Sequence, residues 1–285
     1  MKIGLLMPFT GYTANPAAFA RTAEALGFES VWIPEHPILP VNPKTPFPLT
    51  NGPIPELYAQ MCDPFVALSM VAAVTTKLKV ATGICLVPER NPILTAKAVA
   101  TLDAFSAGRF LFGIGAGWLR EESEILGVDF PRRWTQTEEC VAAMRELWSK
   151  PEASFEGKYV KFSPVRLNPK PVQQPGPPVL IGSLDKNALK RVAKWADGWC
   201  PIGVSQSYLK KQVNELRREC DVVGRDFLKL DITAMGFIEG DQHAVQNGLA
   251  QYASAGAGRF AVAVPRQLKP DDYEAELIRL ASIYV

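Results

Sequence analysis

The fold is decided by residues 79–122, which read KVATGICLVPERNPILTAKAVATLDAFSAGRFLFGIGAGWLREE. Residues 80–87 form an apolar run rich in β-forming side chains, which predicts a strand buried on both faces. Residues 110–114 are a second apolar run and predict a second strand. Because a helix separates the two, we expect a parallel pair of strands joined by a right-handed crossover.

The sequence marks both ends of the intervening helix. Asn91 and Pro92 are residue types preferred at an N-cap and in a first turn, and Gly108 is typical of a helix end. Apolar residues recur at helical spacing between these ends and fall on one stripe of the helix. The stripe consists of Leu94, Ala98, Leu102 and Phe105.

The same alternation of strand and helix recurs along the whole chain. Strands are predicted at residues 2–7, 30–33, 80–87, 110–114, 179–181, 199–200, 228–237 and 260–264. A helix is predicted after each strand, with N-caps at Asn15 and Asp63 and a capping box of Thr135 and Glu138. Eight such repeats without a linker predict a single α/β domain over residues 1–285, a closed (β/α)8 TIM barrel.

Two proline-rich segments interrupt this alternation. Residues 37–62 follow the second strand and residues 151–178 precede the fifth. Neither segment has a helical period, although residues 153–162 read as a hairpin. Barrel enzymes keep their active sites at the strand ends where the first segment lies. We therefore expect both insertions to form walls of a pocket, the first as a mobile lid or as a fixed loop.

The composition argues against several classes of protein. Lysine and arginine number 31 against 29 aspartates and glutamates, without a run of one sign, which disfavours nucleic acid or an anionic membrane as the main partner. No apolar span approaches the roughly 20 residues of a membrane helix. The N-terminal MKIGLLMPFTGYT is better read as a strand than as a signal peptide. The five cysteines are widely spaced without a C-x-x-C motif, so we expect a cytoplasmic protein with reduced thiols.

Chemically capable residues follow the predicted strands. Glu35 and His36 come directly after the second strand, and such a pair at a barrel mouth can hydrogen-bond a heterocyclic ring and exchange a proton. Gly83 lies inside the third strand, where a glycine indicates a bulge or a close approach to the backbone. The fourth strand runs into G-x-G-x-G followed by Trp118. The third glycine of a dinucleotide fingerprint is missing there, so we reject a Rossmann interpretation.

These motifs resemble the luciferase-like monooxygenase superfamily, in particular its branch that uses the deazaflavin coenzyme F420. The resemblance is carried by TGICLVPERNPILTAKAVATLDAFSAGRF and GIGAGWLREESEILGVDF, and it extends to MKIGLLMP, LGFESVWIPEH, PVLIGS and KWADGWCP. It implies a luciferase-like (β/α)8 barrel that binds the deazaflavin or a flavin at the carboxyl ends of its strands. It also implies a homodimer.

The resemblance gives roles to residues around the second and third strands. In such relatives an acidic residue followed by histidine lies beside the cofactor ring, which implies that Glu35 contacts the cofactor and that His36 is catalytic. This chain has Glu35 where aspartate is more usual. The family's third strand carries a bulge with a cis peptide bond that does not involve proline and that backs the ring. We place the bulge at residues 82–85, with Gly83–Ile84 as the cis bond and with cofactor contacts from Thr82, Gly83 and Ile84.

Two turns are expected to hold the rest of the cofactor. Backbone N–H groups at a helix start bind phosphate, and the family places its phosphate near the turn formed by Gly182, Ser183 and Leu184. Small residues after the fourth strand are expected along the ribityl chain, namely Gly115, Ala116 and Gly117. The substrate pocket is expected near Phe9, Trp118 and Trp199.

Other enzyme classes are less consistent with the residues. Only two histidines are present, His36 and His243, so we expect no metal centre. Glu35 and Glu89 both follow barrel strands and are a nominal glycosidase pair, but the other strand ends are apolar. A G-x-S-x-G elbow and a P-loop are both missing from the sequence.

We therefore expect an oxidoreductase that transfers a hydride between coenzyme F420 and an unidentified small organic substrate, with His36 as the proton donor. The main alternative is a two-component monooxygenase that uses oxygen and reduced FMN supplied by a partner flavin reductase. An alternative from another class is a non-catalytic protein that binds a flavin or a deazaflavin.

Overall fold

The chain folds into a closed parallel barrel. The computed structural model describes residues 1–11, 13–265 and 270–285. The strands follow the order β3, β2, β1, β11, β10, β9, β8 and β5, and the pairing of β3 with β5 closes the circle. Their bounds are β1 Lys2–Leu6, β2 Ser30–Ile33, β3 Lys79–Thr82, β4 Cys85–Leu86, β5 Phe110–Gly115, β8 Val179–Ile181, β9 Gly198–Trp199, β10 Asp231–Gly236 and β11 Arg259–Ala263. The predicted TIM barrel is confirmed.

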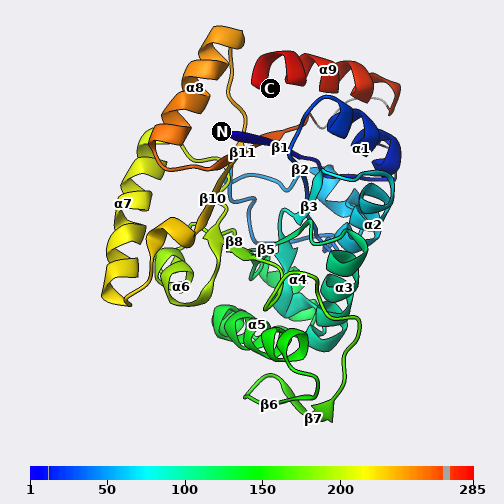
Figure 1. Ribbon diagram of the computed structural model, residues 1–285, viewed down its shortest axis with the longest axis vertical. Coiled ribbons are helices and arrows are strands. Elements are labelled where there is room, and N and C mark those ends of the chain that lie inside the picture. The colour runs from blue at the N-terminus through cyan, green and yellow to red at the C-terminus, as the bar shows by residue number, and fades with distance from the viewer. Residues whose placement is uncertain (12, 266–269) are drawn as a thin grey trace.

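Helices cover the outside of this barrel (Figure 1). They are α1 Pro16–Ala25, α2 Pro64–Val74, α3 Pro92–Phe105, α4 Arg120–Ile125, α5 Arg133–Ser149, α6 Ala188–Trp195, α7 Gln206–Val222, α8 Gln242–Ser254 and α9 Tyr273–Tyr284. Short 3₁₀ turns lie at Glu56–Gln60, Val87–Glu89, Phe130–Arg132, Phe227–Lys229 and Pro270–Asp272. Among the described residues, no helix is long and apolar enough to cross a membrane.

Three helices begin where their sequence predicted. The side chains of Asn15, Asp63 and Asn91 each accept two backbone N–H groups of the first turn, and a proline follows each of them. These contacts satisfy donors that have no partner within the helix. The predicted capping box was wrong, because α5 begins at Arg133 and Thr135 lies inside it.

The third strand is interrupted where the sequence predicted a continuous run. β3 ends at Thr82, the Gly83–Ile84 peptide bond is cis, and β4 resumes at Cys85. The cis bond expected from the family resemblance is thus confirmed. Gly83 packs so tightly that an added Cβ would lie 2.8 Å from Cβ of Trp32, so only glycine fits without a shift of its neighbours.

The side chains inside the barrel form their own buried cluster. Each strand or its end contributes one member: Leu6, Trp32, Ala81, Leu111, Leu180, Cys200, Met235 and Ala261. The larger core lies between the strands and the surrounding helices. A barrel of this kind is therefore packed along its axis.

The apolar stripe identified on α3 does not face the core as a whole. Leu102 is buried, but Leu94 is 69% exposed and Phe105 is 80% exposed, while Ala96 and Val99 are buried. On the neighbouring helix, Val66 is 65% exposed. We refer to the outward apolar surface of these two helices, which includes Val66, Met70, Leu94 and Phe105, as the α2/α3 face.

The seventh strand was also predicted too long. It begins at Asp231, because residues Phe227–Lys229 form a 3₁₀ turn that leaves Leu228 exposed. The start of this strand is difficult to predict, because the preceding turn also contains apolar residues and therefore looks like part of the strand.

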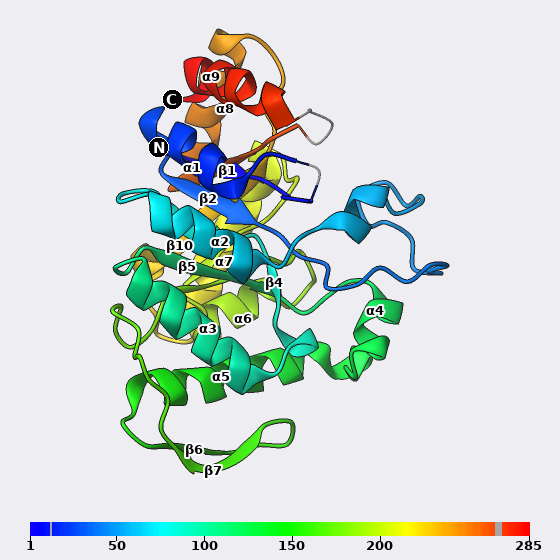
Figure 2. The ribbon, with the colours of Figure 1, turned by 90° about the vertical axis from the view of Figure 1, so that its right-hand side faces the viewer.

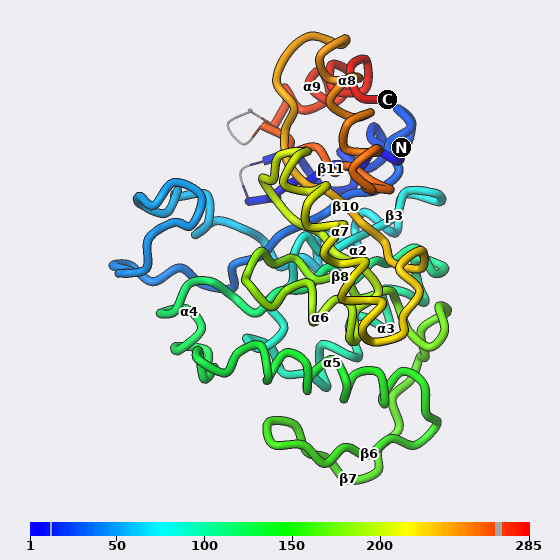
Figure 3. The backbone as a smooth tube through the Cα atoms, turned by 90° about the vertical axis from the view of Figure 1, so that its left-hand side faces the viewer, coloured from blue at the N-terminus to red at the C-terminus, as the bar shows by residue number. Residues whose placement is uncertain are grey.

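The two insertions lie at different places on the barrel. Residues 37–62, which we call the lid segment, extend beyond the carboxyl ends of the strands beside α4 (Figures 2 and 3). Residues 151–178 contain an antiparallel hairpin, β6 Ala153–Glu156 and β7 Lys161–Val165, which packs against α5 (Figure 2). None of residues 151–178 lines the pocket described below. The expectation that both insertions form walls of the pocket was therefore wrong.

Candidate active site

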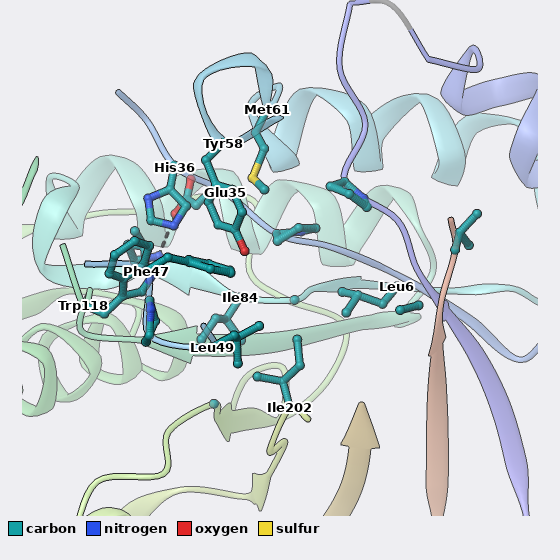
Figure 4. Close-up of a pocket in the computed structure, with 18 residues that line it drawn as sticks. Leu6, Glu35, His36, Phe47, Leu49, Tyr58, Met61, Ile84, Trp118 and Ile202 are labelled. Carbon is teal, nitrogen blue, oxygen red and sulfur yellow. Dashed lines mark hydrogen bonds between the residues drawn. The ribbon is translucent and has the colours of Figure 1, made fainter. Parts of the chain in front are cut away.

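A pocket opens at the carboxyl ends of the strands, beneath the lid segment (Figure 4). Its empty volume is about 900 Å³, continuous with solvent. The barrel supplies Leu6, Ile84, Leu86, Ala263 and Val264, so this part of the wall is apolar. Ligand sites of this size are typically apolar with few polar groups, and the polar groups then fix the orientation of the ligand.

The break in the third strand forms part of the pocket wall. Ile84 projects into a space that two glycines leave open: an added Cβ at Gly115 or Gly182 would lie 2.8 or 2.7 Å from Cδ1 of Ile84. These glycines were assigned to the cofactor from the sequence. The structure gives both a packing role against Ile84, and of the two only Gly182 also lines the pocket.

His36 lies at the pocket and forms a buried pair with Glu122. The His36 Nδ1 atom is 2.6 Å from Oε2 of Glu122, and both side chains are almost completely buried. Because an ionised carboxylate only accepts hydrogen bonds, Nδ1 carries the hydrogen in this pair and Nε2 is left for the pocket. The other carboxylate oxygen of Glu122 accepts the N–H of Ile38, 3.3 Å away. One carboxylate therefore orients the histidine and the start of the lid segment.

A second buried carboxyl group lies next to this pair. Oε1 of Glu89 accepts a hydrogen bond of 2.6 Å from Oγ of Ser123, and its Oε2 has no partner among the described residues. Burial, followed by the charge of Glu122, raises the pKa of Glu89 to about 8. Gly117 has a φ of +80°, and an added Cβ would lie 2.5 Å from Oε1 of Glu89. A side chain at position 117 would therefore collide with the carboxyl group of Glu89. The raised pKa means that Glu89 is mostly uncharged at neutral pH.

Glu35 lines the pocket, but its carboxylate is engaged by the protein. It accepts the N–H of Leu86 at 2.7 Å and binds the guanidinium of Arg90, which also bridges to Asp63. Charge-assisted hydrogen bonds of this kind are strong and directional. Glu35 therefore clamps the segment that follows the cis bond, and it also helps to raise the pKa of the buried Cys85 thiol, after burial itself.

Four rings form an aromatic cluster at one end of the pocket: His36, Phe47, Tyr58 and Trp118. The centroid of His36 lies 5.0 Å from Tyr58 and 5.3 Å from Trp118. Phe47 lies 5.1 Å from Tyr58 and 5.9 Å from Trp118. The edge-to-face arrangement is a favourable one for aromatic pairs. Two of these rings belong to the lid segment, so the cluster packs the lid onto the histidine.

The lid segment is also tied down through its backbone. Oε1 of Glu121 accepts the N–H groups of Lys44 and Thr45, at 2.8 and 3.1 Å. Three successive residues of α4 therefore serve the site, since Glu122 holds His36 and Ser123 holds Glu89. The sequence analysis did not predict α4. Its signal was the acidic run that follows the glycines and tryptophan at the end of β5.

The remaining predicted residues are dispersed. Thr82 donates from Oγ1 to the carbonyl of Gly113 at 2.7 Å, which stabilises the break in the strand. Oγ of Ser183 is bound to Asp185, and Leu184 is exposed. Described residues that do not line the pocket include Ser183, Leu184, Ala116, Phe9 and Trp199.

Phe9 and Trp199, which the sequence placed at the substrate pocket, belong to the core. Phe9 packs edge-to-face on Phe19 of α1 at 5.1 Å. Trp199 is buried and donates from Nε1 to the carbonyl of Ser183 at 2.9 Å. Large side chains at strand ends can fill the space between strand and helix instead of the mouth, and the sequence does not distinguish these two directions.

Three arginines gather at the ends of β5 and β8. Arg120 and Arg133 both stack on the ring of Phe130, at 4.5 and 4.0 Å. Arg191 binds Asp185 at 2.8 Å, next to Ser183. Burial and the charges of Arg120 and Arg191 lower the pKa of Arg133, whereas Asp185 opposes that effect. The predicted phosphate turn therefore lies in a positively charged environment.

Comparison with known proteins identifies the family. A model of the family described as luciferase-like monooxygenase matches residues 1–280. The chain belongs to this family. An uncharacterized protein of Mycobacterium tuberculosis is 37% identical over 288 residues, which cover 99% of this chain and 98% of that protein.

Relatives of this luciferase-like protein use two different cofactors. An F420-dependent glucose-6-phosphate dehydrogenase of Kineococcus radiotolerans is 29% identical. The match covers 81% of this chain and 66% of the length of that dehydrogenase. An FMNH2-dependent dimethylsulfone monooxygenase of Pseudomonas putida is 31% identical, but the match covers only 53% of this chain and 42% of the length of that monooxygenase. The F420-dependent tetrahydromethanopterin reductase of Methanopyrus kandleri shares the fold, with a TM-score of 0.77, 19% identity, and coverage of 99% of this chain and 98% of that one.

Proposed function

We propose that this protein is an oxidoreductase that transfers a hydride between coenzyme F420 and a small organic substrate. The observation that carries the proposal is the buried His36–Glu122 pair, which places an imidazole at a pocket with an apolar wall. Such an arrangement suits proton exchange beside a planar redox cofactor. The proposal is further supported by F420-dependent relatives.

The pocket is chemically suited to a flavin-like ring. Ile84, Leu6 and Leu86 offer an apolar surface to a planar aromatic system. We assign the phosphate to the Gly182–Leu184 turn, with Arg133 and Arg191 supplying positive charge.

In this proposal the protein's own part is positioning and proton exchange. When bound, a reduced deazaflavin supplies a hydride. Reduction of a carbonyl group then needs one proton at oxygen, and His36 donates it from Nε2 while Glu122 stabilises the charged imidazolium through Nδ1. The aromatic cluster and the lid segment exclude water from this end of the pocket.

The second candidate is a two-component FMN monooxygenase. It is favoured by the relative from Pseudomonas putida, whose name specifies FMNH2. In that case reduced flavin would come from a partner reductase, and the apolar walls of the pocket would contact the flavin ring. A non-catalytic binder of the same cofactor would show no turnover with any acceptor.

The test is a paired titration of the cofactor-free protein with coenzyme F420 and with FMN, followed by cofactor fluorescence. Micromolar or tighter binding of F420 with much weaker binding of FMN is the expected result. The opposite preference would replace the proposal by the monooxygenase, and saturable binding of neither would refute both.

Replacement of His36 by alanine tests its role in the reaction. We expect His36→Ala to reduce kcat by roughly 100-fold, the lower range for loss of a general acid, with cofactor affinity within about twofold of the parent. Stopped-flow kinetics and the same fluorescence titration measure the two quantities. A variant that turns over at the full rate would remove His36 from the mechanism.

We also propose that the protein is a homodimer located in the cytoplasm. The α2/α3 face supports a homodimer, because it is a large apolar surface that no other part of the described chain covers. The five cysteines are free and four of them are buried, which agrees with a reducing compartment.

A further inference from the structure

The mouth of the pocket exposes apolar side chains from two separate elements (Figure 4). Leu49 of the lid segment is 56% exposed, and Ile202 in the loop between β9 and α7 is 37% exposed. The Cδ2 atom of Leu49 would lie 3.9 Å from a Cβ added at Gly203, so the lid reaches across to that loop. Exposed apolar side chains that gather at a pocket rim are typical of a surface that a ligand covers.

The walls below this rim are apolar as well. The lid segment contributes Phe47, Pro48 and Met61 to the pocket, whereas its two charged side chains, Lys44 and Glu56, are exposed and do not line it. No lysine or arginine is found among the described residues that line the pocket. The one carboxylate among the described residues that line the pocket, Glu35, is paired with Arg90.

We infer that the pocket selects an uncharged and largely apolar substrate, and that Leu49 and Ile202 are residues that select it. The substrate lies with its one polar reacting group toward His36 and its apolar part against the rim. The nature of that reacting group rests on the proposed function, whereas the preference for an apolar molecule does not.

The physical reason is that an apolar ligand and an anionic ligand differ in how strongly water hydrates them. Each methylene group moved from water to an apolar wall tightens binding roughly three- to fourfold. An anionic group loses its hydration in the same place, and the described apolar rim offers it no lysine or arginine. The substrate would therefore differ from a phosphorylated sugar, which the relative from Kineococcus radiotolerans is named for.

The test uses a homologous series of neutral ketones. We would titrate 2-butanone, 2-hexanone, 2-octanone and glucose 6-phosphate by calorimetry into the protein loaded with oxidised cofactor, so that no turnover intervenes. The expected result is that Kd falls roughly tenfold for each two carbons, with no saturable binding of glucose 6-phosphate. A flat series, no saturable binding of 2-octanone, or micromolar binding of the sugar phosphate would each overturn the inference.

Substitutions at the rim connect this preference to the two side chains. Leu49→Lys and Ile202→Lys are each expected to weaken 2-octanone binding about fivefold to tenfold and to leave 2-butanone nearly unchanged. The matched control is Val222→Lys, which changes an apolar side chain of α7 that is 81% exposed and does not line the pocket. Equal affinity of the parent and both rim variants for 2-octanone would overturn the assignment of these residues.

Failure of the proposed function gives a different pattern. A protein that binds neither F420 nor FMN refutes the function, and the ketone series is then measured on the cofactor-free protein by tryptophan fluorescence. Rising affinity along the series would still support an apolar pocket. Cofactor binding together with selective binding of glucose 6-phosphate would refute only the apolar preference.

Discussion

The imidazole of His36 is held from two directions. Glu122 binds Nδ1 at 2.6 Å, and the rings of Tyr58 and Trp118 pack around the other side. Because Glu122 also accepts the N–H of Ile38, any movement of the lid segment at its start acts on the same carboxylate. The position of the histidine is therefore set by a residue of α4.

Replacement of Glu122 by glutamine keeps its size and removes its charge. We expect Glu122→Gln to lower kcat about tenfold, because the imidazole loses the charged partner that orients it. Cofactor affinity should stay within about twofold. Steady-state kinetics and the fluorescence titration measure the two quantities.

Glu121→Gln is the matched control, since Glu121 binds lid amides and does not contact His36. A merely structural role of Glu122 would weaken cofactor binding together with kcat. That outcome, or an equal loss of kcat in the control, would contradict the assignment.

Glu89 makes the stability of the protein depend on pH. Its pKa is about 8 in the folded protein and near 4.5 in an unfolded chain, so between these values the folded state keeps a proton that the unfolded state releases. The stabilisation is complete below pH 4.5 and is lost as the pH rises toward 8. This single group lowers the free energy of unfolding by about 1.4 kcal/mol per pH unit in that window.

Glu89→Gln should abolish that contribution, because the amide stays neutral. As the pH rises from 5 to 8, the parent should therefore lose stability relative to the variant. Urea unfolding at pH 5, 6.5 and 8 measures it. A difference that stays constant over this range would show that Glu89 is charged in the folded protein.

At the scale of elements, α2 has an unusual composition. It reads PFVALSMVAAV, and Ser69 is its one polar side chain. A helix that is apolar on all sides is usually covered on all sides. Small residues of the two helices, Ser69, Ala73, Ala98 and Thr101, line a groove beside Phe105. A ring next to a groove of small residues suits a two-fold interface, in which each copy inserts Phe105 into the other.

Phe105→Asp tests whether the α2/α3 face is such an interface. We expect the parent to run as a dimer and the variant as a monomer at micromolar concentration, because a charge in an apolar interface loses its hydration. Light scattering after size-exclusion chromatography determines both masses. The control Val222→Asp alters an exposed apolar residue elsewhere and should remain dimeric; a monomeric parent would refute the interface.

At the scale of the whole molecule, the barrel is closed near its amino-terminal end by a buried ion pair network. Arg259 of β11 binds Glu29, which precedes β2, at 2.7 Å and Asp231 of β10 at 2.8 Å. It also binds Oγ1 of Thr233 at 2.8 Å, so the guanidinium is well satisfied. The network joins residues separated by 230 positions in the sequence, and it forms only when the first and last strands of the barrel, β1 and β11, lie side by side.

Arg259→Met removes the positive charge and leaves two partly buried carboxylates. We expect the free energy of unfolding to fall by about 3 to 5 kcal/mol, the usual result when one partner of a buried pair is lost. Urea denaturation followed by circular dichroism measures the change. Arg279→Met, which removes an exposed pairing with Glu276 on α9, should cost at most about 1 kcal/mol. Equal effects of both variants would contradict a role in barrel closure.

The sequence by itself determined the features that depend on near neighbours in the chain. The N-caps at Asn15, Asp63 and Asn91 and the end of a helix at Gly108 follow from hydrogen bonds and backbone angles within a few residues. The repeated alternation of strand and helix then predicted the barrel, and the position of His36 after the second strand placed it at the mouth. The break at Gly83–Ile84 was expected from the family resemblance.

Only the tertiary structure decided which distant side chains meet. Glu122 lies 86 positions from His36, and the two meet because all strands of a closed parallel barrel end at the same rim. The outward direction of Leu94 and Phe105, and the burial of Phe9 and Trp199 in the core, were equally unpredictable from spacing. Periodicity shows that a helix or strand has an apolar side, but the neighbours that cover that side are fixed only when the chain closes on itself.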